Sequence, residues 1–219
     1  MRLLLVNPNT SRETTDAMVR IAEAAAPEGV VIEGATAPWG VGLITNEAQL
    51  ATASEAVLDL LRGRATLPDG VIIAAFGDPA LAEARALLPC PVTGIAEAGM
   101  AEAAAGGRPF AVATTTPDLA AAIAATAHRY GHASLFRGVH LTPGDPAALM
   151  ADRERLQEAL ADACRAGIAA GAEAVVIGGG PLAVAARAIA PLLPVPIIEP
   201  VPAAMRLALE RASSGHATP

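Results

Sequence analysis

The chain has 219 residues and a formal net charge of −7 at pH 7, and 53% of its residues are hydrophobic while 2% are aromatic. This composition predicts an extensively buried interior and argues against nucleic-acid binding, because an acidic chain repels phosphate and few aromatic rings are present to stack on bases. No apolar run approaches the ~20 residues of a membrane helix, and the apolar start before Asn7-Pro8 is too short for a signal peptide. Two cysteines, Cys90 and Cys164, cannot build a disulfide framework or a four-thiolate zinc site. We therefore expect a soluble cytoplasmic protein with no membrane or nucleic-acid partner.

The first half of the chain alternates apolar β-branched runs with helical patterns. Thr10 and Glu13 form a capping-box pattern that predicts Thr10 as a helix N-cap, and Asp78 with Pro79 predicts the N-cap and first residue of a later helix. The predicted strands are 2–6, 30–34, 71–76 and 91–96, the predicted helices are 11–26, 47–62, 79–88 and 97–105, and 37–46 is a Gly-rich loop with the single tryptophan.

Gly106-Gly107 marks the predicted boundary between an N-terminal half, 1–106, and a C-terminal half, 107–212. The segment 195–212 is a candidate to complete the N-terminal sheet, and the small, polar residues 213–219 predict a disordered tail. The predicted strands of the second half are 110–113, 135–141, 175–177 and 195–198, and its predicted helices are 117–130, 147–171, 183–192 and 201–212.

The two halves repeat one another along the sequence. A strand, a glycine turn and a Pro-started helix follow Val71, and the same order returns after Val175 with an offset of 104 residues. The first strand and its turn return at an offset of 106 residues, and Pro91-Val-Thr returns as Pro196-Ile-Ile at 105. The repeat predicts an α/β fold of two pseudo-symmetric lobes, each with a parallel sheet, and an active-site cleft between them.

Four turns follow predicted strands and open predicted helices: Asn7–Thr10, Ala75–Asp78, Thr114–Thr116 and Gly178–Gly180. Ligands of parallel α/β sheets bind beyond the carboxyl ends of the strands, where helix N-termini offer free N–H groups. The turns therefore predict a site for a small anion or a planar amide. The alternative is that these residues only cap their helices.

Several motifs carry a resemblance to a known family: Asn7-Pro-Asn-Thr-Ser11, Phe76-Gly-Asp-Pro79, Gly94-Ile-Ala-Glu-Ala98 and the glycine turn of the second half. With these motifs the chain resembles the aspartate/glutamate racemase superfamily, most closely its hydantoin and allantoin racemase branch. The resemblance implies a cofactor-independent enzyme with a small-molecule substrate and one catalytic cysteine from each half. In this sequence Ala75 and Gly179 occupy the two cysteine positions. Neither residue can carry a proton, so the resemblance implies that the two-thiol mechanism is absent.

Other residues are candidates for the missing chemistry. Asp78 can act as a base if burial raises its pKa, or it can cap its helix. Glu199 can orient substrate or cap the last helix, and Glu47 can reach the site or remain solvated. No His/Asp/Glu cluster has metal-ligand spacing, so we predict no metal and no cofactor. The predicted substrate-binding residues are Asn9, Thr10, Thr45, Ala75, Phe76, Thr115, Thr116, Gly179, Gly180 and Glu199.

Three functions remain open from the sequence. The first is isomerisation of a small hydantoin-like amide or amino-acid-like carboxylate with unusual proton carriers. The second is decarboxylation, C–N lyase chemistry or hydrolysis, in which backbone N–H groups stabilise an enolate or oxyanion. The third is non-catalytic binding of a small ligand. We also expect the chain to form a homo-oligomer.

Overall fold

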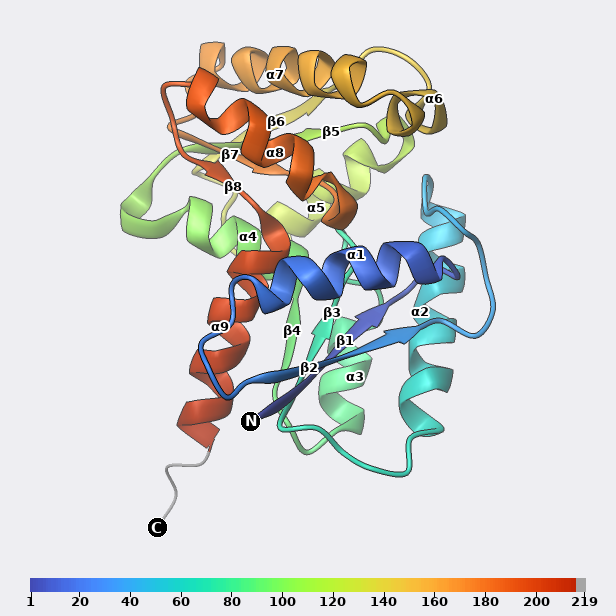
Figure 1. Ribbon diagram of the computed structural model, residues 1–219. Coiled ribbons are helices and arrows are strands. Elements are labelled where there is room, and N and C mark those ends of the chain that lie inside the picture. The colour runs from blue at the N-terminus through green and yellow to red at the C-terminus, as the bar shows by residue number, and fades with distance from the viewer. Residues whose placement is uncertain (216–219) are drawn as a thin grey trace. The chain divides into compact units, whose positions relative to one another are not determined.

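A computed structural model describes residues 1–215 of the chain (Figure 1). The chain forms two compact units: one comprises Met1–Ala98 with the C-terminal segment from Val201, and the other comprises Gly99–Pro200. This division falls inside a helix that begins at Ile95, whereas the sequence places a boundary at Gly106-Gly107. Of the tail expected at 213–219, residues 216–219 lie outside the described part, and the last helix continues to Gly215.

The first unit contains a four-stranded parallel sheet in the order β2-β1-β3-β4. Its two central strands, β1 and β3, consist almost entirely of fully buried Leu, Val and Ile, as expected for strands covered on both faces. Right-handed crossovers place α1 on one face and α2 with α3 on the other (Figure 1). The strands are β1 (Arg2–Asn7), β2 (Val31–Thr36), β3 (Gly70–Ile73) and β4 (Val92–Gly94), and the helices are α1 (Arg12–Glu23), α2 (Glu47–Arg62), α3 (Leu81–Leu87), α4 (Ile95–Ala103) and α9 (Pro200–Gly215).

The second unit repeats this architecture with a parallel sheet in the order β6-β5-β7-β8. Helices α7 and α8 lie side by side over one face of this sheet (Figure 1), where Leu160, Cys164 and Ile189 share a core with Ile177 of β7. The strands are β5 (Phe110–Thr114), β6 (Phe136–Leu141), β7 (Ala174–Ile177) and β8 (Ile197–Ile198); the α-helices are α5 (Ala120–Arg129), α6 (Pro146–Ala151), α7 (Arg153–Ala169) and α8 (Ala183–Ile189); the short 3-10 helices are η1 (Ala105–Gly107), η2 (Pro117–Leu119), η3 (Gly180–Leu182) and η4 (Ala190–Leu192).

The α/β fold with two parallel sheets is confirmed. Each sheet places its first strand between its second and third, so the two units share one strand order. The equivalent strands β3 and β7 end at Ile73 and Ile177, which are 104 residues apart, as the sequence repeat predicts.

Three predicted helix boundaries are wrong. Ser11, and not Thr10, caps α1 by accepting a hydrogen bond from Thr14 N–H, because the helix starts one residue later than predicted, with the Ser11 carbonyl accepting from Thr15 N–H. The helix predicted at 147–171 is two helices, because Asp152 leaves the helical conformation and caps α7. The helix predicted from Pro79 begins at Leu81 and has Ala80 at its N-cap. The predicted N-cap, Asp78, instead accepts hydrogen bonds from the first turn of α4.

A carboxylate at the start of α4 joins three helices of the first unit. Arg85 of α3 donates to both oxygens of Glu97 at 2.8 and 2.7 Å, and Arg211 of α9 donates to the same oxygens at 2.9 and 2.8 Å. Burial by itself raises the pKa of Glu97, but the hydrogen bonds and charges of the two guanidinium groups outweigh it and hold that pKa below its ordinary value. Glu97 therefore stabilises the fold in its ionised form.

We expect Glu97→Gln to lower the free energy of unfolding at neutral pH by about 1–3 kcal/mol, because the two arginines lose a charged acceptor. Since the pKa is lower in the folded chain than the ordinary ~4.3 of a free glutamate, the stabilisation is complete above that pH and is lost as the pH falls through the folded value. Urea unfolding at pH 7 and at pH 3.5 measures both effects. Glu83→Gln, an exposed carboxylate on α3, is the control; an equal loss at both pH values would contradict the assignment.

Candidate active site

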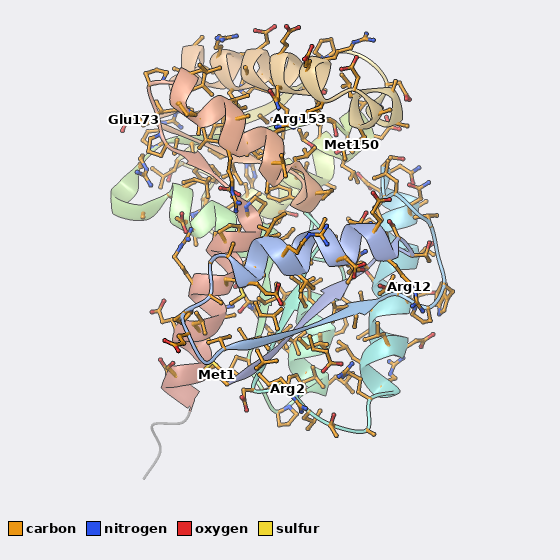
Figure 2. All side chains as sticks on the ribbon, in the orientation of Figure 1. Met1, Arg2, Arg12, Met150, Arg153 and Glu173 are labelled. Atoms are coloured by element: carbon orange, nitrogen blue, oxygen red, sulfur yellow. The ribbon has the colours of Figure 1, made fainter. Side chains whose placement is uncertain are left out.

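The strands of the first sheet are parallel, so their carboxyl ends lie along one edge of the sheet, here called its carboxyl edge. The first turn at this edge follows β1. Figure 2 labels Arg2, the first residue of β1, and Arg12, the first residue of α1, and the turn lies between the end of β1 and Arg12. The Asn7 amide donates to Asn9 Oδ1 at 2.8 Å, to the Ser11 carbonyl at 3.0 Å and to Thr15 Oγ1 at 3.0 Å. Asn7 is fully buried, so it organises the turn from inside the unit.

This turn leaves one polar group for a ligand. The N–H groups of Asn9, Thr10 and Ser11 donate to Asn7 Oδ1, the Val41 carbonyl and Asn9 Oδ1. The expectation of free backbone N–H groups is therefore wrong at this turn. Because Asn9 Oδ1 accepts two hydrogen bonds, the orientation of the Asn9 amide is fixed, and its NH₂ group has no acceptor within residues 1–215. Asn9 thus presents donors and is 9% exposed.

The turn after β3 offers backbone N–H groups to a ligand. Ala75 is partly exposed, whereas its neighbours on both sides are buried. Within the described chain, the N–H groups of Ala75, Phe76 and Gly77 have no hydrogen-bond acceptor. These N–H groups are therefore available to donate to an anion or a carbonyl oxygen.

Asp78 closes this turn and holds it against α4. Its carboxylate accepts from Ala96 N–H at 2.8 Å and from Glu97 N–H at 2.7 Å, so it caps α4 and not its own helix α3. Asp78 and Ala80 both have positive φ, at 52° and 59°, which is costly for residues with a Cβ. A Cβ at Gly94 would overlap the Asp78 carboxylate, so glycine at Gly94 permits this contact.

The carboxyl edge of the second sheet is built from hydroxyl groups. Thr114 is fully buried, and its hydroxyl donates to the Gly178 carbonyl at 2.9 Å. Thr114 Oγ1 also lies 3.0 Å from Thr116 Oγ1. A hydroxyl has one proton, and that of Thr114 is already used, so Thr116 must donate to Thr114. The partly exposed Thr116 hydroxyl therefore presents its lone pairs to a ligand, while Thr115 is buried beside it.

The glycine turn after β7 presents Gly179. Gly179 is partly exposed between buried Gly178 and Gly180, and its φ of 172° is an extended conformation that any residue adopts. A Cβ on Gly179 would lie 2.9 Å from Cδ1 of Leu182, so a larger residue requires that side chain to shift.

The remaining predicted residues engage groups of their own unit. Thr45 donates to Gln49 Oε1 from both its N–H and its hydroxyl, at 2.8 and 3.1 Å, beside the N-cap Asn46 of α2. Both oxygens of Glu199 accept from Arg187 Nε at 3.0 and 2.9 Å. Among residues 1–215, no cluster of three or more His, Cys, Asp or Glu side chains has a metal-binding arrangement. No helix in the same range is both long and apolar enough to span a membrane.

Both thiols lie away from these edges. Cys90 precedes β4 and so lies at the opposite, amino end of the first sheet, and burial raises its pKa. Cys164 is a fully buried residue of α7, and burial raises its pKa to about 12. A thiol with a raised pKa has little thiolate at neutral pH and is a weak nucleophile or base.

Thr142, at the end of β6, is a residue of the second edge that the sequence interpretation missed. Its N–H donates to the Thr114 carbonyl at 3.0 Å, and its side chain is buried. The available signal was its position: like Asn7 and Thr114, it is a polar residue where a parallel strand ends.

Comparison with known proteins places the chain among racemases. A family model described as Asp/Glu/hydantoin racemase matches residues 3–208. The hydantoin racemase of Paenarthrobacter aurescens is 27% identical over 221 residues, which cover 100% of this chain and 94% of that protein. The allantoin racemase of Klebsiella pneumoniae has a TM-score of 0.92 and 33% identity, with 100% of this chain and 90% of that chain covered. The allantoin racemase of Pseudomonas fluorescens has a TM-score of 0.94 and 27% identity, with coverage of 98% and 92%.

We expect Asp78→Asn to lower the free energy of unfolding by about 1–3 kcal/mol, because an amide has one acceptor oxygen for the two N–H groups of α4. Asp145→Asn is the matched control: Asp145 caps α6 through a single oxygen, and asparagine caps a helix as well as aspartate does. Thermal and urea unfolding of both variants provide the measurement. Equal stability of Asp78→Asn and the wild type would mean that the two hydrogen bonds do not maintain the turn.

Proposed function

This chain belongs to the Asp/Glu/hydantoin racemase family, and we propose that it is a cofactor-independent enzyme that binds a small hydantoin-like cyclic amide through groups that follow the carboxyl ends of its strands and transfers protons without cysteine. An amino-acid-like carboxylate is the other substrate class that fits the family. Hydantoin and allantoin racemases among its relatives support the cyclic amide.

The observation that carries the proposal is the set of unused hydrogen-bonding groups that each unit, taken by itself, has at the carboxyl ends of its strands. The first edge offers donors, from the Asn9 amide and the N–H groups of Ala75, Phe76 and Gly77. The second edge offers an acceptor, the Thr116 hydroxyl oxygen. A carboxylate group only accepts hydrogen bonds, and the ammonium group of an amino acid donates them as a cation, whereas a cyclic amide donates from neutral ring N–H groups. The neutral hydroxyl oxygen that Thr116 offers in the second unit therefore favours the cyclic amide over an amino-acid-like carboxylate.

The proton carriers are the second part of the proposal. Ala75 and Gly179 stand where the family resemblance implies thiols, and both are partly exposed. Neither side chain can transfer a proton, and Cys90 and Cys164 lie elsewhere with raised pKa values. Asp78 is the carboxylate nearest in sequence to Ala75, although both of its oxygens already accept hydrogen bonds from backbone N–H groups of α4.

A second candidate function follows from the free N–H groups of Ala75, Phe76 and Gly77. Such groups stabilise the oxyanion or enolate that forms in decarboxylation, C–N lyase chemistry or hydrolysis, and these reactions do not need two opposed thiols. Binding without turnover is the third candidate.

Asn9→Ala and Thr116→Val should distinguish the two edges by ligand chemistry. We expect Thr116→Val to weaken hydantoin binding by about 0.5–1.5 kcal/mol, because the ring N–H loses its acceptor, and to leave 1,3-dimethylhydantoin unaffected. Asn9→Ala should weaken both ligands, since both keep their carbonyl oxygens. Isothermal titration calorimetry with the two compounds measures this. Unchanged hydantoin affinity in both variants would contradict the proposed site.

Replacing both thiols, in Cys90→Ser/Cys164→Ala, should leave turnover within about twofold of the wild type, because neither thiol touches the proposed site and removing a true general acid or base costs about 10²–10⁴-fold. The assay follows a single enantiomer of a 5-substituted hydantoin in D₂O by NMR and polarimetry, with a protein-free sample as the control. Hydrogen exchange with loss of rotation identifies an isomerase, and conversion to a new compound identifies the second candidate. A folded but inactive double variant would contradict thiol-independent chemistry.

A further inference from the structure

A buried hydroxyl at the second edge has no partner. Thr142 is 5% exposed, and within residues 1–215 its Oγ1 is enclosed and makes no hydrogen bond. Three other buried threonines have partners: Thr126 donates to the Ala122 carbonyl at 2.8 Å, Thr114 donates to Gly178, and Thr93 accepts from Arg211. Within residues 1–215, the Thr142 hydroxyl is the threonine oxygen that is both fully enclosed and without a partner.

An unpaired buried hydroxyl destabilises the ligand-free chain, since its hydrogen bonds to water are lost and not replaced. Valine has nearly the same shape without that cost. A hydroxyl at this position is thus unfavourable for the ligand-free fold and favourable only in a state where it gains a partner.

The surroundings of Thr142 indicate what that partner is. Its N–H is bonded to the Thr114 carbonyl, and Thr114 also holds the Thr116 hydroxyl. Thr116 presents an acceptor, whereas the Thr142 hydroxyl has an unused proton. A cyclic amide carries an N–H and a C=O on adjacent ring atoms, which require an acceptor and a donor in turn.

We propose that Thr142 is a substrate-binding residue that donates its hydroxyl proton to a carbonyl oxygen of a cyclic amide; this inference rests on the proposed function. The hydroxyl is enclosed in the ligand-free chain, so the segment after it moves aside on binding. That segment, Pro143-Gly-Asp145, lies between β6 and α6 outside regular structure, and Gly144 has a φ of 101° that favours glycine.

The test compares Thr142→Val with Thr142→Ser, using hydantoin and allantoin as probes. Thr142→Val should raise the thermal midpoint of the ligand-free protein by about 2–4 °C, because an unsatisfied hydroxyl is removed. The same variant should bind the probes about tenfold more weakly, whereas Thr142→Ser, which keeps the hydroxyl, should retain most of the affinity. The matched control is Thr126→Val, which removes a satisfied hydroxyl from α5 and should lower the midpoint without changing affinity.

A higher midpoint combined with weaker binding is a result that a purely structural threonine does not give. Unchanged affinity in Thr142→Val, or a lowered midpoint, would overturn the assignment of Thr142 while leaving the proposed function intact. If the wild-type protein binds neither probe in calorimetry, the proposed substrate class fails, and the role of Thr142 fails with it.

Discussion

The residues that follow the end of a parallel strand no longer form hydrogen bonds with the neighbouring strands. Each of their buried polar groups must therefore find another partner or remain unpaired. The two sheets meet this constraint with different chemistry. In the first unit Asn7 and Asn9 use their side chains to satisfy the turn after β1, so that turn is closed, while the turn after β3 leaves three N–H groups open. In the second unit Thr114 satisfies Gly178 and in doing so fixes the donor and acceptor roles of Thr116. What each edge can offer a ligand is thus set by what its own backbone has already used.

The open turn after β3 depends on Asp78. Two residues with a Cβ, Asp78 and Ala80, hold positive φ there, a conformation that needs compensation from elsewhere. The compensation is the pair of hydrogen bonds from the first turn of α4, where a carboxylate also favours the positive end of the helix. Glu97 donates one of these bonds from its backbone and receives Arg85 and Arg211 on its side chain. The same helix start therefore stabilises both the turn and the packing of α3 and α9.

Much of the fold follows from local signals in the sequence. Runs such as Leu3–Val6 are apolar on both faces and predict buried parallel strands, and the 104-residue offset predicts a second unit with the same order. The missed features depend on partners distant in sequence. Asp78 has the composition of an N-cap for the next helix, yet its acceptors are used by Ala96 and Glu97, 18 and 19 residues away. Thr10 and Ser11 are both common N-cap types, and the structure places the helix start at Ser11, whose carbonyl accepts from Thr15 N–H. No sequence pattern reveals that the Thr142 hydroxyl is enclosed without a partner, because that depends on three-dimensional packing.

The donors and acceptors at the two edges bear on how a substrate is selected. The exposed positions Ala75 and Gly179 carry no ionisable group, and the polar groups identified beside them are amides and hydroxyls. Neutral donors and acceptors discriminate between ligands by geometry and by the cost of leaving a buried group unpaired, and that discrimination is large when a ligand lacks the matching group. Under the proposed function, selection rests on these neutral groups, and a ring with fixed N–H and C=O positions offers each of them a matching partner.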